Sequence, residues 1–281
     1  MTVLLASCVG KLATDKIAVN IEFRPVIGYD TRVEESVPFP EDRSFSLWAQ
    51  NPMSGQMYVD SETISYNGTW TSEKMWPEHP VGFQACWPLD LPVSYSNAKG
   101  LQIKGFDSSR GNVDVLIAKA DSESQVDGKV VLPFNHALSR VEFRMRHSLS
   151  EEMAVRVTKI VLKGFAQTGD YNTQKSYGWS CTDYNASRVI FEAQEGSPAE
   201  LQGGEVLYVG TDFFAIPQIS ASMLQVYYEV RFEDANWIPQ MSELKSLALL
   251  WEAGKHYTYT LNLGMDKLVC TTGISSWNNR E

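Results

Sequence analysis

The stretch Leu224-Gln225-Val226-Tyr227-Tyr228-Glu229-Val230-Arg231-Phe232 alternates two sets of side chains along its length. Successive side chains of an extended strand point to opposite faces, so the apolar set from Leu224 to Phe232 shares one face and Glu229 and Arg231 lie on the other. An amphipathic helix would instead place apolar residues three and four positions apart. The segment therefore predicts a β-strand that buries one face in a core and leaves the other in water.

The same period-2 pattern recurs along most of the chain, most clearly over 17–24, 140–146 and 257–263. Further strand candidates are 45–49, 57–66, 82–87, 113–118, 155–164, 189–192 and 206–215. Asn67-Gly68 and Gly203-Gly204 are typical of turns between such strands. Because only 148–154 and 240–247 could hold short helical turns, the sequence predicts an all-β fold, in which sandwiches are the usual way to bury one-sided strands.

The composition is that of a globular protein with a full core. Of the 281 residues, 43% are apolar and 21% are charged, which excludes a wholly disordered chain. The formal charge of −10, with 34 acidic against 24 basic residues, argues against nucleic acid as a partner. Apolar runs such as Leu247-Ala248-Leu249-Leu250-Trp251 are too short to span a bilayer.

A polar stretch over 119–129 predicts a boundary between two domains. We therefore expect an N-terminal β-sandwich domain over 15–120, a linker over 121–128 and a C-terminal β-sandwich domain over 129–281. From the alternation, ten residues are expected in the core of the C-terminal sandwich. They are Val141, Phe143, Met145, Leu224, Val226, Tyr228, Val230, Tyr257, Tyr259 and Leu261.

Motifs that carry catalysis or metal binding do not stand out. His79, His136, His147 and His256 show no metal-ligand spacing, the cysteines form no CxxC pair, and GxSxG, GxGxxG and Walker-type loops are absent. His136 reads as a turn or strand-entry residue bonded to backbone. Five tryptophans could line a cleft between two catalytic carboxylates, although packing at sandwich edges explains them more simply. They are Trp70, Trp76, Trp87, Trp179 and Trp237. We expect no catalytic residue, no metal and no cofactor.

Cys8 differs from the other cysteines because it ends the run Val3-Leu4-Leu5-Ala6-Ser7-Cys8. An apolar stretch ending in Leu-Ala-Ser-Cys resembles a bacterial lipobox, in which the cysteine takes a lipid and becomes the mature N-terminus. A signal peptide has a charged n-region and a longer apolar region than the seven residues that precede Cys8. Either the true start lies upstream of Met1, with 1–14 as leader remnant and tether, or the match is accidental.

Several short motifs follow the predicted strands in order. They are Tyr29-Asp30-Thr31-Arg32, Ser46-Leu47-Trp48-Ala49, Trp70 with Trp76-Pro77, Val81-Gly82-Phe83-Gln84-Ala85-Cys86-Trp87-Pro88, Asp114-Val115-Leu116-Ile117-Ala118, and the segments 132–141, 251–259 and 273–277. Taken together over residues 17–277, they resemble the fimbrillin family of Bacteroidota pilus proteins, the Mfa-like group. The pattern departs from the family at Cys86, where an aromatic residue is commoner, and in the short leader.

The resemblance implies two transthyretin-like β-sandwich domains in tandem. It also implies export as a lipoprotein and a structural or adhesive role in a pilus (fimbria) at the cell outer membrane, without enzymatic activity. Polymerising members lose their first strand to a protease that cuts after an arginine, then accept a strand from the next subunit. The implied partners are other fimbrial subunits, with a host or bacterial surface ligand as a further candidate, and the membrane is contacted only through lipid on Cys8.

Arg32 is the predicted processing site. It lies in the polar segment Asp30-Thr31-Arg32-Val33-Glu34, beyond the first predicted strand, and a protease needs an accessible, extended segment. Arg24 is less suitable because it lies inside the predicted strand and precedes Pro25. Arg43, directly before the next strand, is the runner-up. If the first strand is instead never removed, Arg32 is a solvated loop residue of a tip or anchor subunit.

Two other function classes stay open. A surface-exposed glycan-binding lipoprotein would use exposed Trp and Tyr rings as stacking platforms for sugars. A hydrolase with two carboxylates would place a pair of its acidic residues across a cleft.

Overall fold

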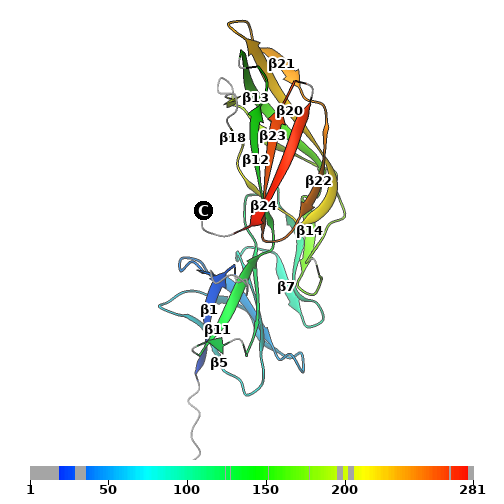
Figure 1. The fold of residues 1–281 in the computed structure, drawn as a ribbon. Helices are drawn as coiled ribbons and strands as arrows, with labels where there is room; N and C mark the ends of the chain where they lie inside the picture. Colours follow the sequence, from blue (N-terminus) through cyan, green and yellow to red (C-terminus); the bar gives the residue numbers. More distant parts are fainter. Residues whose placement is uncertain are drawn as a thin grey trace, which may run out of the picture.

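The structure is a computed structural model that describes residues 19–28, 36–123, 125–126, 128–150, 152–176, 178–194, 199–201, 206–265 and 267–277. Every helix or strand assigned in these ranges is a β-strand, so the predicted all-β class is confirmed. Nothing in the described ranges is a helix of the length and apolarity that crossing a membrane needs. The strands form four sheets along an elongated molecule (Figure 1).

The N-terminal half is built on a nine-stranded sheet, in the lower part of Figure 1. Its order is β2 (Val37–Pro38), β1 (Asn20–Ile27), β11 (Lys129–His136), β9 (Leu116–Asp121), β6 (Gly82–Trp87), β3 (Phe45–Gln50) and β4 (Met57–Ile64), with β10 (Gln125–Val126) paired to β11 and β5 (Trp70–Met75) paired to β1. One face of this sheet forms a core around Phe23, Leu47, Phe83 and Phe134, all of which are fully buried. We call it the N-terminal core.

The C-terminal half is a β-sandwich. One sheet has the order β18 (Leu207–Tyr208), β12 (Ser139–His147), β23 (Lys255–Leu263) and β24 (Leu268–Ser276), with β19 (Phe213–Ala215) paired to β12. The other has the order β16 (Ala186–Glu192), β13 (Met153–Phe165), β20 (Gln218–Phe232) and β21 (Ile238–Met241), with β17 (Ala199–Leu201) paired to β13 and β22 (Lys245–Trp251) paired to β20. Side chains of both sheets meet in a second core, which buries Phe143 and Tyr259.

A third core lies between the two halves. The second face of the nine-stranded sheet contributes the side chains of Trp48, Cys86 and Ile117 to this core. They pack against Trp179 and Leu138. Over them lies a small sheet with the order β15 (Trp179–Ser180), β14 (Thr168–Asn172), β8 (Gly100–Asp107) and β7 (Val93–Ser96). We call this cluster the junction core. Because strands β3, β6 and β9 are covered on both faces, their sequences are apolar without clean alternation.

The predicted C-terminal core is largely confirmed. Eight of the ten residues are buried, and the two that are not, Tyr228 and Val230, are half-buried at the margin of the core. No helical turn is assigned to the described residues of 148–154 or 240–247, because 240–247 falls into β21, β22 and their connection, and β13 begins at Met153. The strand predicted at 113–118 corresponds to β9, which begins and ends three residues later. The strand predicted at 206–215 is two short strands, β18 and β19, on either side of Gly210.

The strand pairing also locates the change from one half to the other. β11 follows the expected linker at 121–128, yet it pairs with β1 and β9 in the nine-stranded sheet. The next strand, β12, belongs to the C-terminal sandwich. The crossing between the large sheets therefore lies at Ala137 and Leu138, both of which are buried in the junction core.

Candidate functional site

Strand β1 occupies a slot between other strands of the nine-stranded sheet. Along one edge it pairs in parallel with β11, from Phe23 opposite Val130 to Ile27 opposite Phe134. Along the other edge it pairs with β5 and β2 in antiparallel. A withdrawn β1 would therefore leave unpaired backbone groups on both sides of the slot, and a replacement strand could form hydrogen bonds with both.

The apolar face of β1 is part of the N-terminal core. Ile21 and Phe23 are no more than 1% exposed, Ile27 is 5% exposed, and the Phe23 ring meets Phe83 edge to face at 5.6 Å. Burying three such side chains contributes on the order of 5–9 kcal/mol. This is comparable with the whole net stability of a domain, about 5–15 kcal/mol. An empty slot would therefore cost the N-terminal half much of its stability.

Phe39, which follows β2, is buried in the N-terminal core together with the apolar side chains of β1. Its ring centroid lies 4.8 Å from that of Phe134 and 5.6 Å from those of Phe45 and Trp70. The backbone N–H of Phe39 donates to the Pro25 carbonyl of β1 at 3.2 Å. A break in the chain before β2 would free β1 and keep Phe39 attached, whereas a break after Phe39 would detach both.

The structure places only some of the residues predicted for processing. Cys8 and Arg32 lie outside the described residues. Arg24 is exposed on β1 opposite Val131, so its backbone belongs to the sheet. Arg43 is exposed between β2 and β3, where its guanidinium lies 4.5 Å from the centroid of the Trp87 ring.

The last described strand, β24, ends in a cluster that the sequence did not indicate. Trp277 stacks on His136 with ring centroids 3.7 Å apart and on Phe214 at 4.9 Å. Nδ1 of His136 lies 2.8 Å from a carboxylate oxygen of Asp114, so its partner is a side chain rather than the expected backbone group. The three rings come from the end of β11, from β19 and from the residue that follows β24, and only the folded chain brings them together.

The five tryptophans considered for a cleft are divided among three environments. Trp70 and Trp179 are buried in the N-terminal and junction cores, and Trp76 and Trp87 pack against the former. The Trp237 ring contacts the guanidinium groups of Arg156 and Arg231, at 4.2 and 4.7 Å from its centroid. These rings do not line a shared carbohydrate cleft.

A fimbrillin-like family model matches residues 31–277. Three solved structures share the fold at low identity. A fimbrial protein from Bacteroides vulgatus aligns with a TM-score of 0.67 at 13% identity, over 92% of this chain and 99% of its own. A candidate cell adhesion protein from Parabacteroides distasonis has a TM-score of 0.60 at 8% identity, over 94% and 97% of the two chains. A candidate cell adhesion protein from Bacteroides ovatus has a TM-score of 0.54 at 15% identity, over 94% and 99%. A search of curated proteins gives no match.

Proposed function

This chain belongs to the fimbrillin-like family, and we propose on that premise that it is a structural and adhesive pilus subunit that assembles by donor-strand exchange. The observation that carries the proposal is the slot of β1, with backbone partners on both edges and an apolar core beneath. A donated strand with a matching period-2 pattern would restore the lost hydrogen bonds and the lost burial together. Its partners are other fimbrial subunits, and its place is the cell surface.

Processing after Arg32 would prepare the subunit for exchange. A cut there would leave Phe39 in the N-terminal core, held against Phe45, Trp70 and Phe134. A cut after Arg43 would release Phe39 as well and open a larger cavity beside the slot. Arg24 is held in the ladder with β11, which a protease would first have to open.

The test is to digest the purified protein with an arginine-specific protease, sequence the new N-terminus and follow assembly. We expect a product that begins at Val33 and an oligomer ladder that survives SDS without heating. A peptide of residues 17–27 in excess should occupy the slot and suppress the ladder, whereas a scrambled peptide should not.

Two variants sharpen the experiment. Arg32→Ala should resist processing and stay monomeric, and Arg43→Ala should be cut and assemble like the original. A product beginning at Ser44, or cleavage after Arg32 with no change in assembly, would contradict the proposed route.

Cys8 is the proposed lipidation site, which would hold the precursor at the outer membrane before assembly. Expression from the natural gene with a labelled fatty acid should mark the protein, and Cys8→Ala should remove the label. A label that persists in Cys8→Ala, or one that never appears in the original, would rule out this anchor.

A further inference from the structure

A polar groove of about 640 Å³ lies on the outward face of the C-terminal sandwich. Its floor is formed by outward side chains of β12 and β23, with Ser275 of β24 at one side. Its wall is the segment 208–212, which follows the edge of β12. The groove is separate from the slot of β1, which belongs to the N-terminal core.

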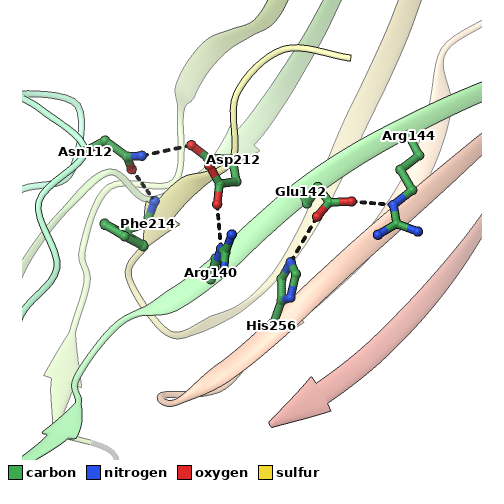
Figure 2. Close-up of polar contacts among 7 residues, drawn as sticks. All are labelled: Asn112, Arg140, Glu142, Arg144, Asp212, Phe214 and His256. Atoms are coloured by element: carbon green, nitrogen blue, oxygen red, sulfur yellow. Dashed lines mark hydrogen bonds and ion pairs between the residues drawn. The ribbon is translucent and has the colours of Figure 1, made fainter. Parts of the chain in front are cut away.

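The wall of the groove is held in a fixed position from both sides (Figure 2). The Asn112 amide donates to the Asp212 carbonyl and accepts from the Phe214 N–H, both at 2.9 Å. The Asp212 carboxylate pairs with Arg140 on the floor. Gly210, with φ +76°, makes the bend, because a Cβ there would lie 2.3 Å from the Ile190 carbonyl oxygen. The wall is therefore ordered before a ligand binds, so binding would cost little conformational entropy.

The charges of the floor are paired within the protein. Glu142 lies between the Arg144 guanidinium, which donates to one carboxylate oxygen, and His256, whose Nε2 lies 3.4 Å from the other (Figure 2). Each of the two arginines has a carboxylate partner, so the groove carries little net charge. Hydroxyl groups of Thr211, Thr258 and Ser275 complete the lining.

Tyr208 gives the groove an aromatic rim. It is 59% exposed, and the Arg144 guanidinium lies 4.3 Å from its ring centroid. This cation–π contact and the pairing of its backbone with Arg144 restrict the motion of the ring. A large exposed ring beside rigid, paired polar groups offers a flat apolar surface and hydrogen-bonding groups at once.

We propose that this groove binds a neutral oligosaccharide. Sugar hydroxyls both donate and accept, so they can contact carboxylate, guanidinium and hydroxyl groups without bringing a charge that the groove would have to balance. The C–H face of a sugar ring can pack on Tyr208. The volume lies within the range of about 300–1,000 Å³ of small-molecule sites. The inference goes beyond strand exchange by giving the adhesive role a chemical class of ligand.

The experiment is to screen the purified protein on an array of neutral, sialylated and sulfated glycans and to measure the affinity of the bound neutral glycans by calorimetry. We expect neutral glycans to bind. Tyr208→Ala should weaken binding about 2- to 12-fold, which is the loss that corresponds to one aromatic contact. Glu142→Gln keeps the size of the side chain and should also weaken binding. Tyr184→Ala, which removes another exposed tyrosine, should bind normally.

Several outcomes would overturn the proposal. They are no binding of neutral glycans by folded protein, equal affinity in Tyr208→Ala, or binding of charged glycans only. Self-association that Tyr208→Ala weakens would identify the groove as an interface between copies instead. Because the slot of β1 is separate, Tyr208→Ala should still be processed and assemble, so failure here is distinguishable from failure of the strand-exchange proposal.

Discussion

Tyr259 in the C-terminal core makes a hydrogen bond that its neighbours cannot replace. The residue is 1% exposed, and its hydroxyl accepts from Nε1 of the buried Trp251 at 3.0 Å. Burial raises the pKa of Tyr259, so the hydroxyl stays neutral. Tyr259→Phe would leave the indole N–H without an acceptor, and we expect a loss of about 1–3 kcal/mol in the free energy of unfolding, measured by urea denaturation.

The matched control is Tyr257→Phe, two residues away on β23. The Tyr257 hydroxyl accepts from the backbone N–H of the exposed Glu252 at 2.9 Å, where water can take its place. This variant should lose less stability than Tyr259→Phe. Equal losses would show that the Trp251 hydrogen bond is not what makes Tyr259 important.

Cys86 in the junction core should be chemically inert in the folded protein. It is 1% exposed, and burial raises the pKa of its thiol to about 12. The reactive thiolate is therefore scarce at pH 8. Iodoacetamide should alkylate Cys86 only after unfolding, as mass mapping of native and denatured samples would show. Rapid alkylation of the native protein would mean that the junction core opens readily.

Single residues also show how far the sequence could predict the structure. Val226 and Val230 share one face of the alternating pattern, yet only Val226 is fully buried. The pattern specifies which way a side chain points, whereas its burial depends on where the opposite sheet ends. The stack of His136 and Trp277 joins residues remote in sequence, so no local pattern could predict it.

Strand β24 is held chiefly at its two ends and by its hydrogen bonds. It pairs with β23 from Leu268 opposite Leu263 to Ser276 opposite Lys255, while its side chains from Thr271 to Ser276 are exposed. Trp277→Ala would remove the stack on His136 and Phe214. Because few side chains hold the strand elsewhere, hydrogen exchange of the amides near Ser276 should accelerate.

The control for this element is Trp237→Ala, which removes a tryptophan that contacts two arginines of the other sheet. It should leave exchange in β24 unchanged. Unaltered exchange in Trp277→Ala would show that the ladder with β23 suffices to hold the strand.

Strands with one solvent-facing side were the most clearly predictable, and β3 and β6 were also predicted although both their faces are covered, whereas β22 was not. β22 carries buried Leu247, Leu249 and Trp251, but Ala248 and Leu250 between them are also apolar although exposed. This removes the contrast on which a period-2 pattern depends, so the sequence of the first part of β22 is also compatible with a helical turn. The slot of β1 followed from sequence only as far as the alternation of Ile21 and Phe23, since pairing with β5 and β11 is a property of the whole sheet.

At the scale of the whole molecule, the junction core makes the two halves depend on each other. Leu138 is fully buried there, among side chains from both halves. Leu138→Ala should cost about 2–5 kcal/mol in the free energy of unfolding. Hydrogen exchange should rise in β8 and β12, on both sides of the junction.

Leu250→Ala is the matched control, because Leu250 is 56% exposed on β22. An exposed position of this kind should change stability by no more than about 0.5 kcal/mol. If Leu138→Ala raised exchange in one half alone, the halves would be energetically independent despite their shared core.

The short crossing between β11 and β12 also bears on how the molecule would carry a mechanical load. Only Ala137 and Leu138 separate the two strands, so one nearly continuous extended segment runs through both halves (Figure 1). Each of its strands lies parallel to a neighbour, β11 to β1 and β12 to β23. A pull along this segment would load those ladders in shear, with many hydrogen bonds resisting together instead of unzipping in turn. The backbone that joins the two sheets would thus transmit tension directly from one half to the other, because the two-residue connection can extend very little.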